Sequence, residues 1–196
     1  MSQLKLTADG GGGTVAIKGP ASTTGNNAFE LTVPGNASGT ILTSNSSVGK
    51  ILQVIQSVKL NTASFAANSG FNDTGLSATM TPSKASSKIL VTYRIFVGMS
   101  SGNVRVSRLA SSVAGASFAA VSNTEIRSYY GNTQDTSQIN NISFDFLDSP
   151  SYSLGQTVAY RVEYDPLSST GYINRWGGSG SAGNVVSVIT LMEVAA

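Results

Sequence analysis

Apolar and polar residues alternate along several segments of this chain, and this alternation constrains the fold more than any other feature. In KILVTYRIFVG, residues 88–98, every second side chain from Ile89 to Val97 belongs to one apolar and aromatic set. NISFDFLDS, residues 141–149, and TVAYRVEYD, residues 157–165, alternate in the same way. A period of two is typical of a β-strand with one buried face. No window keeps helical spacing over three turns, so the sequence predicts an all-β domain.

Two further segments carry apolar residues in other patterns. The segment ILQVIQSVKL, residues 51–60, places four apolar side chains on one face with a glutamine as the exception: Leu52, Val54, Val58 and Leu60, and Gln56. The closing segment VVSVITLMEV, residues 185–194, has apolar residues on both faces. We therefore expect the closing segment to lie centrally in a sheet or against another subunit.

The connections between these segments are rich in residues that favour turns. They include PSKASSK, GNTQDTSQ, DSPSYSLGQ and GGSGSAGN. Roughly nine or ten strands at such close intervals indicate an antiparallel β-sandwich, with the jelly roll as the expected type. The order of the strands cannot be deduced from one sequence.

The first 48 residues have a different character. A glycine run and two prolines, Pro20 and Pro34, punctuate two short apolar bursts, VAI and FELTV. The apolar residues of these bursts are Val15, Ile17, Phe29, Leu31 and Val33. A flexible linker would lack such residues, and short isolated strands leave unpaired edges. We expect residues 1–48 to form an extended assembly arm or shaft that pairs with neighbouring subunits, and residues 49–196 to form the sandwich.

The charged residues are few and scattered. The 196 residues include 12 Lys and Arg against 10 Asp and Glu, which gives a formal net charge of +2. Binding to nucleic acid needs a dense basic patch, so we expect no nucleic-acid partner. No stretch of 18 apolar residues and no signal-peptide pattern are present. We expect no membrane insertion, and synthesis in a cytoplasm.

The chain contains no His and no Cys. It therefore lacks an imidazole base, a His or thiolate metal ligand, a thiol nucleophile and a disulfide. Carboxylate chemistry and Ser-Lys chemistry remain open. We expect no catalytic residues, no metal site and no cofactor.

Three groups of residues are candidates for a chemical site. The tetraglycine 10–13 is not followed by the residues of a phosphate-binding loop. The turn PSKASSK contains two Ser-Lys pairs, but an activated lysine must be buried. The carboxylate pairs Asp145 with Asp148 and Glu163 with Asp165 suggest a glycosidase or a calcium site. We interpret Glu163 and Asp165 first as a solvated strand face on which Arg161 forms a charge pair.

Aromatic residues near loops are the better candidates for binding. Sugar recognition uses an aromatic ring against the apolar face of the sugar, surrounded by polar groups. The candidate glycan contacts are Tyr129, Tyr130, Tyr152, Tyr172 and Trp176. The alternative is that each ring packs in the core or at a subunit interface.

The succession of segments along nearly the whole chain is more specific than any one of them. It runs from GGGTVAIKGPASTTGNNAFELTVPGNASGTILTSN through GKILQVIQSVK, ATMTPSKASSKILV, FLDSP, YRVEY and GYINRW to a closing ITLMEV. This succession resembles a family of tailed-phage structural proteins from marine phages of the cyanophage type, described as tail-fibre or virion-surface proteins. The resemblance implies a place in a phage particle and, as for fibre-like proteins generally, a homotrimer. It supplies no catalytic motif.

We therefore expect a non-enzymatic virion structural protein, in the first instance a short trimeric tail fibre or fibre head whose loops contact host surface polysaccharide. The alternative is a capsid decoration or head-fibre protein that stabilises the capsid lattice. A depolymerase-type tailspike is the third hypothesis, and it predicts sugar release that depends on Glu163 or Asp165. Tailspike catalytic domains are usually built from repeated solenoid coils, and the sequence shows no such repeat.

Overall fold

The computed structural model describes residues 50–101, 104–129, 138–177 and 185–195, together with the backbone of two short strands nearer the start. The chain divides into two compact units, Met1–Leu42 and Thr43–Ala196. In the first unit, β1 (Gln3–Thr7) and β2 (Thr14–Lys18) pair antiparallel. The TVAIK segment, which we expected to pair with other subunits, thus pairs with its own chain. A strand nearby in sequence is a partner that costs little loop-closure entropy.

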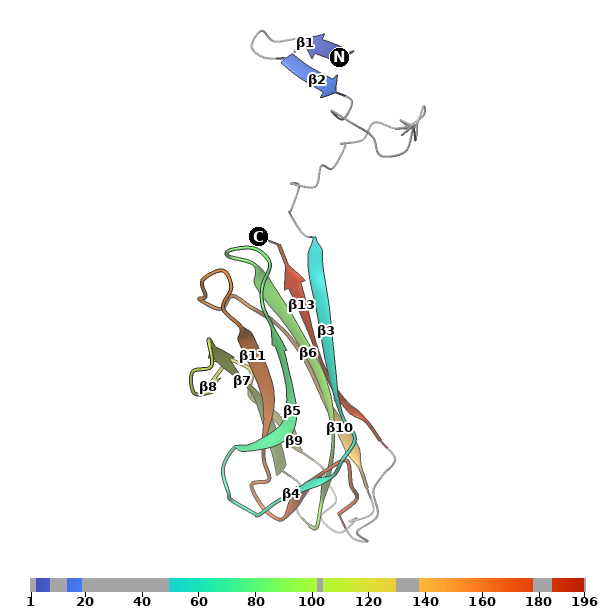
Figure 1. Cartoon of the computed structure of the whole chain (residues 1–196). Coiled ribbons are helices and arrows are strands. Elements are labelled where there is room, and N and C mark those ends of the chain that lie inside the picture. The colour runs from blue at the N-terminus through green and yellow to red at the C-terminus, as the bar shows by residue number, and fades with distance from the viewer. Residues whose placement is uncertain are drawn as a thin grey trace. The chain divides into compact units, whose positions relative to one another are not determined.

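Two antiparallel sheets form the larger unit. The first contains β3 (Ile51–Lys59), β4 (Ala63–Phe65), β6 (Lys88–Met99), β10 (Asn140–Asp148), β12 (Gly171–Ile173) and β13 (Ser187–Val194). The second contains β5 (Asn72–Met80), β7 (Val104–Val113), β8 (Ala119–Ala120), β9 (Ile126–Tyr129) and β11 (Val158–Asp165). Figure 1 shows the two sheets as two layers. The described residues contain no helix, and the predicted all-β antiparallel sandwich is confirmed.

The strand order is that of a jelly roll. The main strands of the first sheet run β3-β13-β6-β10, and those of the second run β5-β11-β7-β9. In chain order, these eight main strands alternate between the two sheets except at the step from β7 to β9. This alternation gives the two nested Greek keys of a jelly roll. Val97 of β6 pairs with both Asn140 of β10 and Ile173 of β12. A strand residue can pair with one neighbour on each side, and β10 occupies one side of Val97. β12 therefore lies on the other side of β6, where β13 also pairs, and it extends that row of the sheet beyond the end of β13.

The core lies between the two layers and follows the predicted alternation. Every second residue of β6 from Ile89 to Val97 is buried, and so is every second residue of β11 from Val158 to Tyr164. These two strands lie in different sheets, so one apolar cluster joins them. The closing strand β13 lies between β3 and β6, in the central position that we expected.

Buried tyrosines carry polar groups into the core, and two of them find partners. The hydroxyls of Tyr93 and Ser107 lie 2.9 Å apart and join the sheets. The hydroxyl of Tyr160 donates to Asp148 at 2.7 Å. Burial raises the pKa of Tyr93 to about 12, although the hydrogen bond with Ser107 opposes that shift. Tyr93 is therefore neutral at ordinary pH and costs the core no buried charge.

The apolar face of β3 is turned outward. Val54 and Val58 are 54% and 51% exposed, and Gln56 between them is exposed as well. Ile55, on the other face, packs against the core. β3 is an edge strand that pairs with β13 alone among the described strands. Its outward apolar residues belong to the surface analysed below.

We expect Leu191→Ala to lower the free energy of unfolding by about 2–5 kcal/mol, because Leu191 on β13 is fully buried in the core. Urea denaturation at one fixed protein concentration measures the change. The matched control is Leu154→Ala, since Leu154 is 61% exposed and its loss should change stability by less than about 0.5 kcal/mol. Equal losses in the two variants would contradict the central place of β13.

Candidate interaction surface

The outer face of the β5-β11-β7-β9 sheet is ionic and internally paired. Glu163 accepts from Arg108 at 2.7 Å and from Arg161 at 2.6 Å. Arg161 also reaches Asp73 at 3.4 Å. Two aromatic rings cover the guanidinium groups. The guanidinium carbon of Arg108 lies 3.8 Å from the centre of the Phe71 ring, and that of Arg161 lies 4.4 Å from the centre of the Phe118 ring. These charges are satisfied within the subunit, and the face needs no partner to neutralise them.

The predicted charge pair of Arg161 and Glu163 is thus confirmed, but the face is not solvated as we expected. Glu163 and Asp165 are both buried. The arginines and rings that pair with Glu163 also exclude water from it, which a sequence pattern of alternating charges does not reveal. Burial raises the pKa of Asp165, and the nearby Arg127 partly opposes that shift.

The second carboxylate pair is separated by the sheet itself. Asp145 is exposed on the outer face of β10, whereas Asp148 accepts the hydroxyl of Tyr160. The described residues contain no group of three or more acidic side chains that is suited to hold a metal ion. Asp145 and Asp148 therefore do not face each other across a cleft, as the two carboxyl groups of a glycosidase do.

The outer face of the β3-β13-β6-β10 sheet has the opposite character. The strand register arranges its side chains in three rows across the four strands. The rows are Val54, Met192, Leu90 and Leu147; Gln56, Thr190, Thr92 and Asp145; and Val58, Val188, Arg94 and Ser143. We call this surface the open face. The first row is wholly apolar, and Val54 and Leu147 at its two ends are 54% and 47% exposed.

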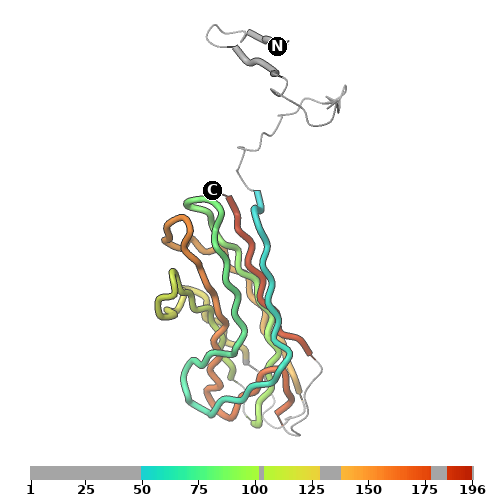
Figure 2. Tube along the Cα trace, viewed as in Figure 1, coloured from blue at the N-terminus to red at the C-terminus, as the bar shows by residue number. Residues whose placement is uncertain are grey.

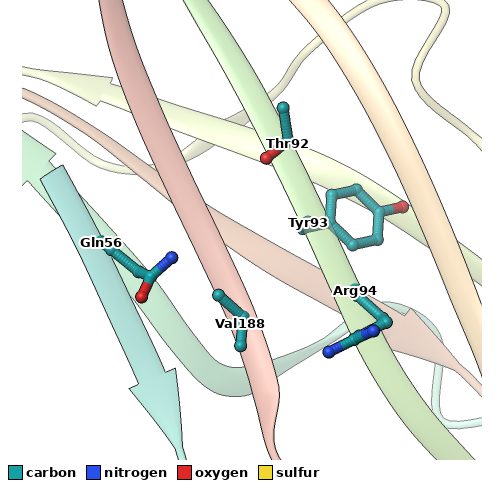
Figure 3. A pocket seen from close by; sticks show the side chains of 5 residues that line it. All are labelled: Gln56, Thr92, Tyr93, Arg94 and Val188. Atoms are coloured by element: carbon teal, nitrogen blue, oxygen red, sulfur yellow. The ribbon is translucent and has the colours of Figure 1, made fainter. Parts of the chain in front are cut away.

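A shallow depression of about 300 Å³ lies on the open face. Figure 3 shows Gln56 on β3, Val188 on β13, and Thr92 and Arg94 on β6 around it. Gln56 donates to Thr190 at 3.1 Å, so the amide is anchored to the neighbouring strand. The depression is open and is lined by both polar and apolar groups. Small molecules bind mostly in enclosed pockets, so this depression is better suited to a side chain of a macromolecular partner.

The charged residues of the three rows are Arg94 on β6 and Asp145 on the edge strand β10, and the exposed Lys88 lies on the same side of β6 beyond the first row. Within the described part of the chain, neither Arg94 nor Asp145 takes part in an ion pair. The guanidinium of Arg94 lies 5.4 Å from the centre of the Phe96 ring. These two charges contrast with Glu163 and Asp73 of the opposite sheet, which both form ion pairs with arginines.

The candidate glycan contacts fall at opposite ends of the sandwich. The first end holds the start of β3 and the end of β13, which lie side by side in Figure 2, and Ala195 donates its backbone N–H to Lys50 at 2.9 Å. Tyr152 belongs to this end, because its hydroxyl donates to the carbonyl of Lys84 at 2.8 Å. Tyr172 pairs with Gly98 near the other end of β6. Tyr152 and Tyr172 therefore do not belong to one platform.

The other four candidates differ in exposure: Trp176 is exposed, Tyr172 is half-buried, and the side chains of Tyr129 and Tyr130 lie outside the described residues. Trp176 is 40% exposed, so it is not a core residue. Tyr172 lies on strand β12 and carries the guanidinium of Arg175 4.3 Å from its ring centre, which occupies one face of the ring. Tyr129 ends β9, near the same end of the sandwich as Tyr172, but its side chain lies outside the described residues. Tyr130 lies outside them altogether, and so do Phe29, Leu31, Val33 and the side chains of Val15 and Ile17.

The PSKASSK turn is held by a carboxylate that the sequence analysis did not single out. Glu193 of β13 is fully buried and accepts from the backbone N–H of Ser83 at 2.9 Å and of Lys84 at 3.1 Å. The hydroxyls of Ser83 and Ser87 donate to it at 3.0 and 2.8 Å. Gln53 donates at 2.7 Å. The two serines therefore serve to hold the turn, and the signal in the sequence was an acid inside the apolar closing segment.

No model of a known protein family matches the chain, and no curated protein matches it in sequence. In the part of the chain that the structure describes, no helix is long and apolar enough to cross a membrane. The geometry of the surfaces and the resemblance noted in the sequence are thus the observations that bear on function.

We expect Glu193→Gln to destabilise the protein at neutral pH by about 1–3 kcal/mol, because an amide turns an N–H group toward other donors. Burial acts to raise the pKa of Glu193, but hydrogen bonds from Ser83, Gln53, Ser87 and Lys84 outweigh it and hold the pKa below its usual 4.5. A lowered pKa in the folded state stabilises the protein above that value, and the stability is lost as the pH falls through the folded pKa.

The measurement is the free energy of unfolding in urea between about pH 7 and pH 3, where the variant should lose less stability on acidification than the parent. Glu125→Gln is the control, since Glu125 forms an exposed ion pair with Arg127 that contributes little. If Glu193→Gln keeps the full acid dependence of the parent, this carboxylate does not stabilise the turn.

Proposed function

We propose that this chain is a non-enzymatic virion structural protein, a short trimeric tail fibre or fibre head that functions by assembly. The observation that carries the proposal is the open face, on which an apolar row crosses four strands and nothing in the described part of the chain covers its ends, Val54 and Leu147. Exposed apolar surfaces of this extent mark sites of interaction. The resemblance to phage structural proteins supports the same conclusion.

The two ends of the sandwich support a role in presentation to a host surface. The chain enters the sandwich at Lys50, beside the end of β13. Tyr172 and Trp176 lie toward the opposite end of β6. A subunit held through its N-terminal residues would thus present those two aromatic residues at the other end, and a host polysaccharide is the ligand class that exposed aromatic residues with polar neighbours suit.

A capsid decoration protein is the second candidate, and the regular pairing of the four strands of the open face favours it. A face of this kind can lie against a protein lattice and bury apolar area there. The two candidates differ in stoichiometry: a fibre occurs in few copies at the tail, and a decoration protein occurs in many copies over the head.

We expect the chain to be found in purified phage particles, in few copies and at the tail. Quantitative mass spectrometry of the particles measures the copy number, and immunogold labelling with antibodies against residues 49–196 gives the position. Many copies over the head would favour the decoration protein. Absence from purified particles would contradict both forms of the proposal, and release of reducing sugar from host polysaccharide by the purified chain would contradict its non-enzymatic part.

A further inference from the structure

We infer that the open face is the contact surface between copies of this chain, and that Arg94 of one copy pairs with Asp145 of the next. The inference deepens the proposed function, on which it rests for the biological reason to assemble. It names the surface and the partner: further copies of the same chain, whose β3-β13-β6-β10 sheets face a common axis so that each sheet contacts those of its neighbours.

The first support is the distribution of apolar side chains. Val54, Met192, Leu90 and Leu147 form a row from one edge of the sheet to the other. Val58 and Val188 add a second apolar patch next to the depression beside Arg94. Residues at these positions gain free energy only when another surface removes them from water.

The second support is area. β3 and β10 bound the four main strands of this sheet, and the register aligns all four over six positions, 53–58 of β3, 188–193 of β13, 89–94 of β6 and 143–148 of β10. Strands about 4.8 Å apart that rise about 3.3 Å per residue then cover roughly 400 Å² of flat area. Side-chain relief makes the accessible area larger than the flat area. The aligned part of the face alone thus supplies at least about half of the roughly 800 Å² per partner that a stable protein interface buries.

The third support is charge. Arg94 and Asp145 lie on the same face, on neighbouring strands, and Asp145 pairs in register with Thr92, two residues before Arg94. Each lacks an ion-pair partner among the described residues. Within the three rows, one charge of each sign lies among apolar residues, and Lys88 lies beyond them at one end of the sheet. A second copy of these rows is complementary to the first, because each copy supplies a countercharge for the other. A partner with a single dominant charge would leave one of the two unpaired.

The ionic face of the other sheet is a poorer contact surface. Both of its arginines that flank Glu163 are already paired within the subunit, since Glu163 is shared between Arg108 and Arg161 and Arg161 also reaches Asp73. To bury this face against a partner would desolvate those groups without offering new pairs. Association through the open face is therefore more favourable in free energy than association through the ionic face.

The test of the surface uses the absence of cysteine from the natural chain. A single thiol is introduced at each edge of the open face, by Val54→Cys and Leu147→Cys, in the full-length protein. Leu154→Cys is the matched control, since Leu154 is an exposed leucine in a turn outside the face. The rate of reaction with a maleimide is measured from dilute to concentrated protein, with light scattering for the mass of the assembly.

We expect the thiol at one or both open-face positions to react at least about tenfold more slowly in the assembled protein than after dilution, and the control thiol to react at one rate throughout. A stable monomer at all concentrations would overturn the inference. So would an assembly in which both open-face thiols react as fast as the control, because the copies would then be held together elsewhere.

The test of the ion pair is a charge exchange. We expect Arg94→Glu and Asp145→Arg each to weaken self-association by about tenfold or more, because like charges then meet across the interface. An equal mixture of the two variants restores unlike pairs between different copies and should associate more tightly than either variant alone. If the mixture behaves as the average of its components, the pair does not form between copies.

These outcomes are separable from failure of the proposed function. A chain that is absent from particles but protects its open-face thiols would refute the virion role and keep the interface. A chain that is present in particles but leaves those thiols reactive in the assembly would do the reverse.

Discussion

The sandwich depends on the burial of one face of each sheet against the other. β6 and β11 contribute the inward residues from Ile89 to Val97 and from Val158 to Tyr164, and together they form one core across the two layers. The burial of that core fixes the side on which every neighbouring residue must lie, because side chains alternate along a strand. Once the inner faces are set, the composition of the two outer faces follows from the sequence. The difference between those outer faces is then the feature from which function is argued.

The sequence predicted the strands whose alternation is regular, and the structure confirms their inner faces. It did not predict the direction of the apolar face of β3, since periodicity marks two faces without saying which one is buried. Only the pairing of β3 with β13 resolves this, and it turns Val54 and Val58 outward. The charge pair of Arg161 with Glu163 was readable from their spacing on one strand, whereas Arg108 comes from β7 and Phe71 from the loop before β5. Contacts between distant segments are not encoded in local pattern.

Two buried glutamates show how the same residue type is satisfied by different means. Glu163 is neutralised by two arginines on an outer face. Glu193 forms no ion pair with the described residues and is held by neutral donors: backbone N–H groups, serine hydroxyls and an amide. Several convergent donors favour the charged carboxylate even without a countercharge. As a result, Glu193 ties the end of β13 to the turn before β6, and it stiffens the end of the sandwich where the chain enters.

The low charge of the chain makes the open face more consequential. Charged residues make up 11% of the sequence, and several of them lie in the paired network of the opposite face. Charges that neutralise one another contribute little to keeping an apolar surface apart from its copies. The open face is left with Arg94 and Asp145, which are too few to solvate it but sufficient to select an orientation. Apolar burial would then supply the affinity of an assembly, and the two charges would supply its register, since complementary charges contribute more to specificity than to affinity.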